Sequence, residues 1–482
     1  MIPNWLLQRA YLTPDRVALS FEQQQWTFQE LHDEAMRIAR KLYANGLREG
    51  TRVALLGPSN AHMMFMIHGC LLGSIEIVMI NSRLSEKEIA YQLLDSEAEA
   101  IIVEDSLAEK LQTIDRKKLL FSFIASSEEI DFTPINTWKA EQTITIMYTS
   151  GTTGFPKGVR QTVGNHTSNA LSSVLNLGLS ENDVWLCTTP LFHISGFSII
   201  VRSLLYGMGI RLYEKFDAIE AAEEIQKGSV TRMSVVANSL DRILREMEKS
   251  EMFAHPNFQT MLAGGGPLPI DYLRRAEKRG IAVLQTYGMT ETSSQTATLS
   301  ADDALRKIGS AGKPLFFNQI KIRDAEKPMQ HGEVMIAGPH VTPGYVGRFA
   351  DRNPLEDGWL PTGDIGYMDH EGYLYIVDRR SDLIISGGEN IYPAEIENVL
   401  VSHPSVLEAG VCGQEDEKWG SVPIAFLVCK EPIEKEEIEK FCLERLAKFK
   451  VPKSFYIVDE LPRNASNKLM RRELKHFRKR PL

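Results

Sequence analysis

Short apolar strands alternate with helices through most of the chain, and this alternation restricts the fold more than any other feature of the sequence. Capping boxes open two of the helices, at Thr27–Glu30 and Ser85–Glu88. Strands joined through helices form parallel sheets that helices cover on both faces, so the pattern predicts an α/β fold with mostly parallel sheets. The expected strands are 52–56, 75–80, 100–103, 143–146, 184–187 and 210–213, and the expected helices include 61–72, 165–175 and 196–206.

The pattern changes twice toward the C-terminus. Short strands and turns replace the helices over 308–378, which predicts a β-rich subdomain. Because 482 residues exceed one ordinary core, we expect two domains, 1–380 and 381–482, divided at the charged linker Asp378–Asp382. The elements expected after the linker are a helix from residue 393, strands at 408–412 and 422–429, a helix at 433–448 and a solvated basic helix at 471–480.

Composition excludes several classes of protein. The net charge of -9 argues against a nucleic-acid-binding protein. Five scattered cysteines without a CxxC pair indicate reduced thiols in a cytoplasmic protein, and no His/Cys spacing suggests zinc. The N-terminus lacks the pattern of a secretory signal. His62, His68, Gly73 and Glu76 interrupt the most apolar window, so no integral membrane contact is expected. A homo-oligomer is compatible with all of these features.

The segment Thr149–Gly158 contains four hydroxyl side chains, three glycines and one lysine directly after a predicted strand. Glycines let backbone N–H groups converge on one point, and hydroxyls add further donors, so the segment suits nucleotide phosphates. It is not a Walker A loop, because Pro156 stands where that motif requires glycine. Local chemistry alone leaves two interpretations, a phosphate cradle or a Gly/Thr-rich surface turn.

Four further stretches carry unusual combinations of residues. Leu262–Pro269 holds three glycines against which a flat ligand can lie, or forms a tight strand-to-helix turn. Gln285–Thr292 combines an aromatic ring, a glycine, hydroxyls and a carboxylate, which serve stacking, phosphate contact and metal binding. Pro361–Asp364 is expected to be a turn that presents one carboxylate, either to ribose hydroxyls or to a surface salt bridge. Pro462–Lys468 is a polar loop that ends in a lysine.

Taken together and in this order, the motifs resemble those of the adenylate-forming superfamily, which includes acyl-CoA synthetases, firefly luciferase and adenylation domains. The matching positions are Thr149–Gly158, Tyr287–Glu291, Thr362–Asp364, Arg379 and Lys468, and they span nearly the whole chain. The resemblance implies a large N-terminal domain of two helix-covered, mostly parallel sheets plus the β-rich subdomain, and a small mobile α+β C-terminal domain. It also implies ATP and CoA as co-substrates and Mg²⁺ as the metal ion.

The implied reaction has two half-reactions. A carboxylate attacks the α-phosphate of ATP, and the thiol of CoA then displaces AMP. Two anions meet in the first step, so the site must supply positive charge and oriented donors. The implied catalytic residues are Lys468, Thr290 and His193, with Glu291 as the Mg²⁺ ligand. The implied nucleotide contacts are Thr149, Ser150, Gly151, Thr152, Thr153, Gly154 and Lys157 to phosphates, Gly265, Gly266, Tyr287 and Gly288 around adenine, and Asp364 and Arg379 to ribose.

The resemblance further implies that the C-terminal domain rotates between the half-reactions. Ser381 occupies the hinge position, where other members often carry Asp or Lys. Gly387, Gly388 and Trp419 match residues that line the CoA site. Phe155 is a second departure, because the superfamily usually has a polar or charged residue there.

A closer resemblance is to the bacterial o-succinylbenzoate–CoA ligases of menaquinone biosynthesis, carried by Gln161–His166, Pro190–Gly196, 378–395 and 461–468. It implies a small aromatic carboxylic acid as substrate. The candidate substrate contacts are His193, Arg202 and Ser293. Each residue also has an alternative role. His193 can be a packing or gating histidine, the guanidinium of Arg202 can reach solvent, and Ser293 can cap a helix.

Three other functions were weighed. An aryl-acid adenylating enzyme that loads a carrier protein is a rival within the superfamily, but Gly387, Gly388 and Trp419 favour free CoA. A non-catalytic nucleotide-binding protein is disfavoured because Lys468 and Glu291 are both retained. A serine hydrolase is excluded by the lack of a G-x-S-x-G motif.

Overall fold

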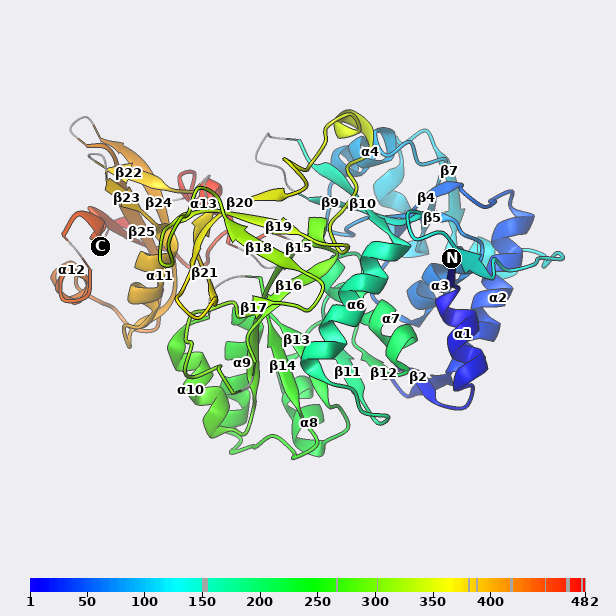
Figure 1. Ribbon diagram of the computed structural model, residues 1–482, viewed down its shortest axis with the longest axis horizontal. Coiled ribbons are helices and arrows are strands. Elements are labelled where there is room, and N and C mark those ends of the chain that lie inside the picture. The colour runs from blue at the N-terminus through cyan, green and yellow to red at the C-terminus, as the bar shows by residue number, and fades with distance from the viewer. Residues whose placement is uncertain are drawn as a thin grey trace.

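The computed structural model describes residues 1–149, 155–265, 268–300, 302–379, 382–386, 389–416, 419–446, 448–464, 469–477 and 480–481. Two large sheets form the N-terminal body (Figure 1). Both are parallel except at their ends, where β10, β3, β16 and β17 pair antiparallel with their neighbours. The expected mostly parallel α/β fold is therefore confirmed.

The first sheet has the order β10-β9-β5-β4-β6-β7, and the second has the order β17-β16-β15-β14-β13-β11-β12-β2-β3. The strands of the first sheet are β4 (Arg52–Leu56), β5 (Glu76–Met79), β6 (Ala100–Val103), β7 (Lys117–Leu120), β9 (Thr143–Thr149) and β10 (Lys157–Thr162). The strands of the second are β2 (Val17–Phe21), β3 (Gln24–Thr27), β11 (Val184–Cys187), β12 (Gly209–Leu212), β13 (Arg232–Val235), β14 (Thr260–Ala263), β15 (Val283–Met289), β16 (Ser294–Thr298) and β17 (Lys313–Pro314).

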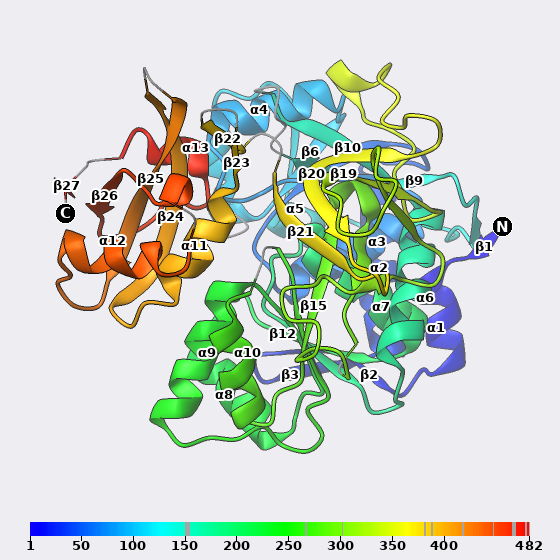
Figure 2. The ribbon, with the colours of Figure 1, turned by 60° about the vertical axis from the view of Figure 1, so that its left-hand side comes forward.

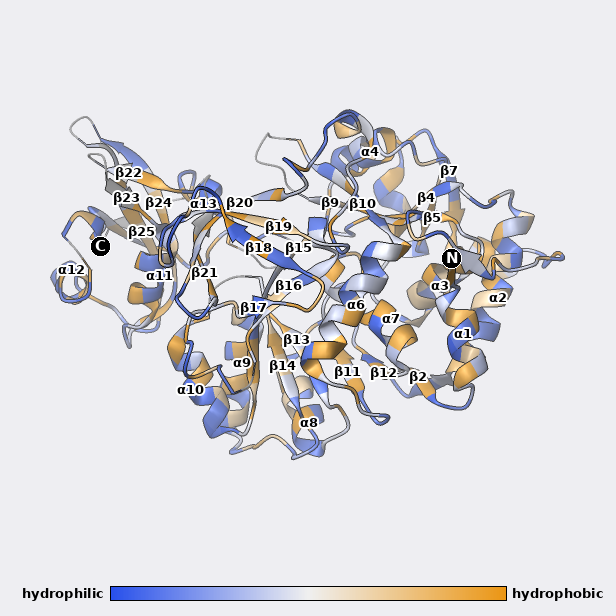
Figure 3. Cartoon of the chain, in the orientation of Figure 1, coloured by the Kyte–Doolittle hydropathy of each residue, from blue (hydrophilic) through white to orange (hydrophobic). Residues whose placement is uncertain are grey.

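Helices cover these sheets, and their local sequences explain where they begin. The predicted capping boxes form at Thr27 and Ser85, and a third forms at Thr162 with Asn165. The main core lies between the two sheets, since side chains of both sheets join those of α1, α2, α3 and α7 in one cluster. In Figure 3 many strands of the two large sheets are orange, which marks hydrophobic residues, and the helices that cover them carry hydrophilic blue on their outer faces. The helices are α1 (Trp5–Leu12), α2 (Phe28–Ala44), α3 (Ala61–Leu72), α4 (Glu86–Asp95), α5 (Phe121–Ser126), α6 (Val163–Leu177), α7 (Ile194–Tyr206), α8 (Ala218–Lys227), α9 (Ala237–Lys249) and α10 (Ile270–Lys278).

The remaining sheets are smaller. An antiparallel sheet of β18 (Gln319–Ile322), β19 (Gly332–Ala337), β20 (Leu360–Met368) and β21 (Leu374–Arg379) forms the expected β-rich part. The C-terminal sheet has its own hydrophobic clusters, and both views place it beside β20 and β21 (Figures 1 and 2). Its elements are β22 (Ile384–Ser386), β23 (Glu389–Ile391), α11 (Pro393–Val401), β24 (Val406–Asp416), β25 (Gly420–Cys429), α12 (Lys435–Leu443), β26 (Ser454–Ile457), α13 (Arg471–Leu474) and β27 (Arg480–Pro481). Among the described residues, no helix has the length and apolar character of a membrane span.

Three local expectations were wrong. The basic helix expected at 471–480 is α13 and ends at Leu474, and its first residue, Arg471, is not solvated but forms ion pairs with Glu397 at 2.7 Å and Asp382 at 3.0 Å. The turn expected at 361–364 lies within strand β20. Gly363, at a φ of 75°, gives that strand the local bend that resembled a turn in the sequence. The helix expected at 433–448 is shorter than predicted, since α12 covers only Lys435–Leu443.

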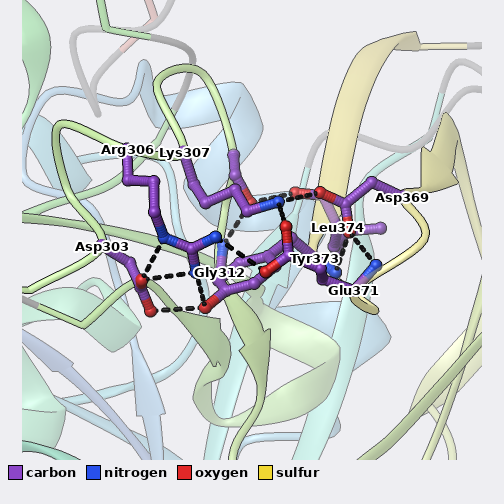
Figure 4. A network of polar contacts seen from close by, with 9 residues as sticks. Asp303, Arg306, Lys307, Gly312, Asp369, Glu371, Tyr373 and Leu374 are labelled. Carbon is purple, nitrogen blue, oxygen red and sulfur yellow. Dashed lines mark hydrogen bonds and ion pairs between the residues drawn. The ribbon is translucent and has the colours of Figure 1, made fainter.

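A network of charged groups ties the segment before β17 to the hairpin between β20 and β21 (Figure 4). Lys307 Nζ lies 2.7 Å from Asp369 Oδ2, and Arg306 Nη1 lies 2.7 Å from Glu371 Oε2. Arg306 also pairs with Asp303 at 2.7 Å. The sheet order is β18-β19-β20-β21, so the network attaches the β-rich sheet to the larger body at its β20–β21 side.

Acid is expected to weaken this network. The hydroxyl of Tyr373 and then Arg306 and Ser300 donate to Asp303, which lowers the pKa of its carboxyl from 3.8 to about 2. A carboxyl pKa that is lower in the folded state stabilises the fold above the unfolded value and loses that effect as pH falls through the folded value. Asp303→Asn should therefore lower the thermal midpoint near neutral pH, and its difference from wild type should narrow as pH falls from about 4 toward about 2. Calorimetry of both proteins checks this, and a difference that does not vary with pH would contradict it.

Candidate active site

The centre of the site is the reversal of the chain between β15 and β16. Thr290–Thr292 forms a single 3₁₀ turn after β15, and the chain returns antiparallel at Ser294. A Cβ atom on Gly288 would lie 1.7 Å from the carbonyl oxygen of Ser294, so only glycine fits there. Ser293 and Ser294 have φ values of 52° and 117°. The reversal thus presents Thr290 and Glu291 on a backbone that is held in a sparsely populated conformation.

The predicted adenine and ribose contacts come together at this end of β15. The Tyr287 hydroxyl donates to Asp364 Oδ2 at 2.7 Å, and Asp364 is buried. Asp364 also pairs with Arg379 in the backbone register of β20 and β21. Gly265, at a φ of 89°, follows β14, the strand that pairs with β15. Tyr287 is therefore in contact with Asp364, to which Arg379 is paired through the backbone, and Gly265 follows the strand next to β15.

Lys157 and Thr149 face each other in the register of β9 and β10. The Lys157 ammonium lies 5.3 Å from the ring centroid of Tyr345 and 5.6 Å from that of Phe349. Burial and then the charge of Glu291 raise the pKa of Tyr345. Tyr345 therefore lies near both the Lys157 cation and the Glu291 carboxylate, which are the charges that a magnesium triphosphate needs.

Phe155, a departure from the superfamily, has a structural role. The Arg348 guanidinium lies 4.1 Å from its ring centroid, and the Tyr91 ring lies 5.9 Å away. Tyr91 also donates its hydroxyl to the Pro156 carbonyl at 3.1 Å. The residues that lead into β10 are thus anchored to α4 by an aromatic side chain rather than a polar one.

Backbone carbonyls of the reversal are held by groups that the sequence reasoning missed. Asn169 Nδ2 donates to the carbonyls of Thr292 at 3.1 Å and Gln295 at 2.7 Å. The backbone N–H of Thr342 donates to the Glu291 carbonyl at 2.7 Å. A signal was present for Asn169, because it lies four positions after Asn165 on the same face of a predicted helix. Its partners are more than 120 positions away, which no local pattern could indicate.

The candidate substrate contacts lie on α7 and beside the reversal. Arg202 is buried, its Nη2 donates to Gln295 Oε1 at 2.8 Å, and its guanidinium lies 5.1 Å from the Trp185 ring centroid. The head of Arg202 therefore does not reach solvent. Ser293 Oγ is buried and has no hydrogen-bond partner among the described residues. His193 is half-buried at the start of α7, with its ring 4.6 Å from that of Phe192.

Several predicted site residues lie outside the described residues: Ser150, Gly151, Thr152, Thr153, Gly154, Gly266, Ser381, Gly387, Gly388 and Lys468. Trp419 is described and exposed between β24 and β25. The described residues include no group of three or more His, Cys, Asp or Glu that could enclose a metal ion. Mg²⁺ in nucleotide sites uses one or two carboxylates together with substrate phosphates, so the lone carboxylate of Glu291 fits it.

A two-sheet α/β domain followed by a small separate sheet is also the arrangement expected of the AMP-binding enzyme family. Residues 6–346 match that family and residues 395–468 match the C-terminal domain of AMP-binding enzymes, so the chain belongs to this family. It is 50% identical over 483 residues to the 2-succinylbenzoate–CoA ligase of Geobacillus kaustophilus, covering 99% of this chain and 98% of that protein.

Solved structures agree with this assignment. The o-succinylbenzoate CoA synthetase of Bacillus subtilis in complex with its acyl-adenylate intermediate is 46% identical, with a TM-score of 0.94 over 99% of each chain. The same enzyme in complex with ATP and magnesium ion is 45% identical, with a TM-score of 0.91 over 98% of this chain and 99% of that one. The expected superfamily and fold class are thereby confirmed, while the roles of individual residues stay predictions.

Proposed function

We propose that the chain is an ATP-dependent acid–CoA ligase that converts 2-succinylbenzoate, ATP and CoA to 2-succinylbenzoyl-CoA, AMP and pyrophosphate in menaquinone biosynthesis. The function predicted from the sequence agrees with the relatives, which match 98% or more of the chain. The observation that carries the proposal is the hydrogen bond between Tyr287 and Asp364, next to Thr290 and Glu291. It supports the proposal because it places the residues that we assign to adenine and ribose near the end of β15, which leads into the residues that we assign to the α-phosphate and Mg²⁺.

In the first half-reaction, the substrate carboxylate attacks the α-phosphorus of ATP and pyrophosphate leaves. We assign Asp364 and Arg379 to the ribose, Tyr287 to adenine, and Thr290 to the α-phosphate. Lys157 and the segment before it hold the departing phosphates, and Lys468 places a positive charge between the two reacting anions. Mg²⁺, when bound at Glu291, neutralises charge on the phosphates. In the second half-reaction, the CoA thiol attacks the acyl carbon and AMP leaves.

The division of the chain supports a conformational step between these reactions. We propose domains 1–380 and 381–482, with Ser381 as the hinge and Gly387, Gly388 and Trp419 facing CoA after rotation. The hydrophobic clusters of the C-terminal sheet contain only residues from Ile384 onward, which supports a unit that moves as one body. A cytoplasmic location and a homo-oligomer belong to the same proposal.

One assay tests the substrate. Acid-dependent AMP release is measured in parallel with 2-succinylbenzoate, benzoate and a medium-chain fatty acid, each with and without CoA. We expect the highest kcat/KM with 2-succinylbenzoate and accumulation of a thioester only when CoA is present. A preference for benzoate or the fatty acid would overturn the menaquinone assignment but leave the ligase class intact. AMP release without any thioester product would overturn the use of CoA.

A further inference from the structure

We propose that Gln161 is a positioning residue for the first half-reaction, because its side-chain amide fixes the carbonyl of Thr290 and so places Thr290 and Glu291. The inference rests on the function proposed above, which assigns these two residues to the α-phosphate and Mg²⁺. Gln161 Nε2 donates to the Thr290 carbonyl at 2.9 Å, across 129 positions of the chain. The side chain of Gln161 is fully buried.

A directed chain of hydrogen bonds sets the orientation of this amide. Thr145 Oγ1 donates to Gln161 Oε1 at 2.7 Å, and Thr145 Oγ1 lies 2.8 Å from His166 Nε2. Since the one hydroxyl proton of Thr145 is given to Gln161, His166 Nε2 must be the donor to Thr145. The oxygen of the Gln161 amide therefore faces Thr145, and its N–H group faces Thr290. All three side chains are buried, where such chains strengthen each bond.

The internal hydrogen bonds of the reversal centre on Thr292, whose Oγ1 accepts from the Met289 N–H at 3.0 Å and lies 3.1 Å from the carbonyl oxygens of Met289 and Ser294, so these bonds do not hold the Thr290 carbonyl. The Thr290 carbonyl accepts from the Ser293 N–H at 3.2 Å, a longer contact than the one from Gln161. Ser293 and Ser294 both have positive φ values, and this conformation costs free energy unless neighbouring groups stabilise it. Gln161 holds the first carbonyl of the turn, and the anchors described above hold the later ones.

Strand β10 also connects this anchor to the phosphate-binding end of the site. Lys157 and Gln161 lie on the same face of β10, four residues or about 13 Å apart. The backbone of β10 pairs with β9 along its length. One rigid strand therefore carries both the cation proposed for the departing phosphates and the donor that positions the α-phosphate contact.

The alternative is that Gln161 is only a satisfied buried amide. Asn318 provides a matched control, because its Nδ2 donates to the Thr296 carbonyl at 3.0 Å and it is also buried. Its bond ends on β16 rather than on the turn that carries Thr290 and Glu291. Gln161→Leu and Asn318→Leu each remove one buried donor from a backbone carbonyl. Gln161→Leu also removes the oxygen that accepts from Thr145, whereas the Asn318 oxygen has no hydrogen-bond partner among the described residues, so Gln161→Leu should cost more stability.

The first experiment measures acid-dependent ATP–pyrophosphate exchange with 2-succinylbenzoate across a Mg²⁺ titration. We expect Gln161→Leu to lower kcat about tenfold and to raise the half-saturating Mg²⁺ concentration, with less change in KM for the acid. Asn318→Leu should also lower the thermal midpoint, by a smaller amount, but leave kcat and the Mg²⁺ dependence close to wild type. Wild-type kinetics in Gln161→Leu would overturn the inference. Absence of exchange in the wild-type protein would overturn the proposed function instead.

The second experiment uses Gln161→Glu and keeps the inference testable even where Gln161→Leu does not fold. A protonated carboxyl can donate to Thr290 while it accepts from Thr145, but a carboxylate cannot donate. Burial raises the pKa of a carboxyl, so the protonated form persists at the acidic end of the assay range. We expect the exchange rate of Gln161→Glu, divided by that of wild type, to fall as pH rises. A ratio that is constant with pH would show that the donor is not required and would overturn the inference.

Discussion

Lys468→Ala is expected to slow acyl-adenylate formation by at least about 10²- to 10³-fold, the range for loss of one preorganised donor. Thioester formation from supplied acyl-adenylate should remain largely intact. Two anions meet in the first half-reaction, and a protonated lysine supplies the positive charge between them. In the second half-reaction the acyl group is already joined to AMP and is no longer a free carboxylate, and this step proceeds, in our proposal, after Lys468 has left the site.

The described residues support this placement of the segment that leads to Lys468. Arg463 Nη2 pairs with Glu408 Oε2 at 2.6 Å, and Glu408 Oε1 accepts from Asn238 Nδ2 of α9 at 3.3 Å. The beginning of the segment is therefore linked to the N-terminal body through Glu408.

Pyrophosphate exchange and CoA thioester formation from synthetic acyl-adenylate measure the two half-reactions separately. Lys475→Ala is the matched control, because Lys475 is an exposed lysine of the same domain. It should leave both rates close to wild type. An equal loss of both rates in Lys468→Ala would contradict its assignment to the first half-reaction alone.

Arg202→Met is expected to lower kcat/KM for 2-succinylbenzoate by at least about 30-fold, the lower end for truncation of a buried charge contact. Arg202 is fully buried, and burial is the largest cause that lowers its pKa. Within the described part of the chain it forms no ion pair with a carboxylate, although Gln295 accepts from it. The second carboxylate of the substrate would complete the pairing of this cation.

The specificity ratio between 2-succinylbenzoate and benzoate measures this role. Benzoate lacks the second carboxylate, so its kcat/KM should change little in Arg202→Met. Arg211→Met serves as the control, because Arg211 is a partly buried arginine of β12 that already pairs with Glu224 at 3.1 Å. It should leave the ratio unchanged. If Arg202→Met slowed both acids equally, the buried cation would be structural and the second carboxylate would bind elsewhere.

Local sequence determined the elements well where capping and apolar periodicity agreed. The helix expected at 61–72 is α3 with the same bounds, and both predicted capping boxes form. The strands expected at 52–56 and 100–103 are β4 and β6. The ordered motifs were also sufficient to predict the family. These successes share one cause, since each signal lies within a few neighbouring residues.

The remaining features depend on contacts between distant segments. Arg471, the first residue of α13, pairs with carboxylates 74 and 89 positions away instead of facing solvent. The carbonyl of Thr290 is held by Gln161, and those of Thr292 and Gln295 by Asn169, at separations no periodic pattern records. For the same reason the sequence could not indicate that Phe155 packs against Arg348.

The backbone pairing of Asp364 with Arg379 has a thermodynamic consequence. It is the last backbone pair between β20 and β21, and Arg379 is the last residue of the final strand before the proposed C-terminal domain. The proposed ribose contacts and the proposed pivot therefore share one strand end. By linkage, if a bound nucleotide favours one orientation of the C-terminal domain, that orientation must increase nucleotide affinity by the same factor. Rotation toward CoA would then loosen AMP at the moment when the thioester forms, so that product release and domain motion are two measures of a single coupling free energy.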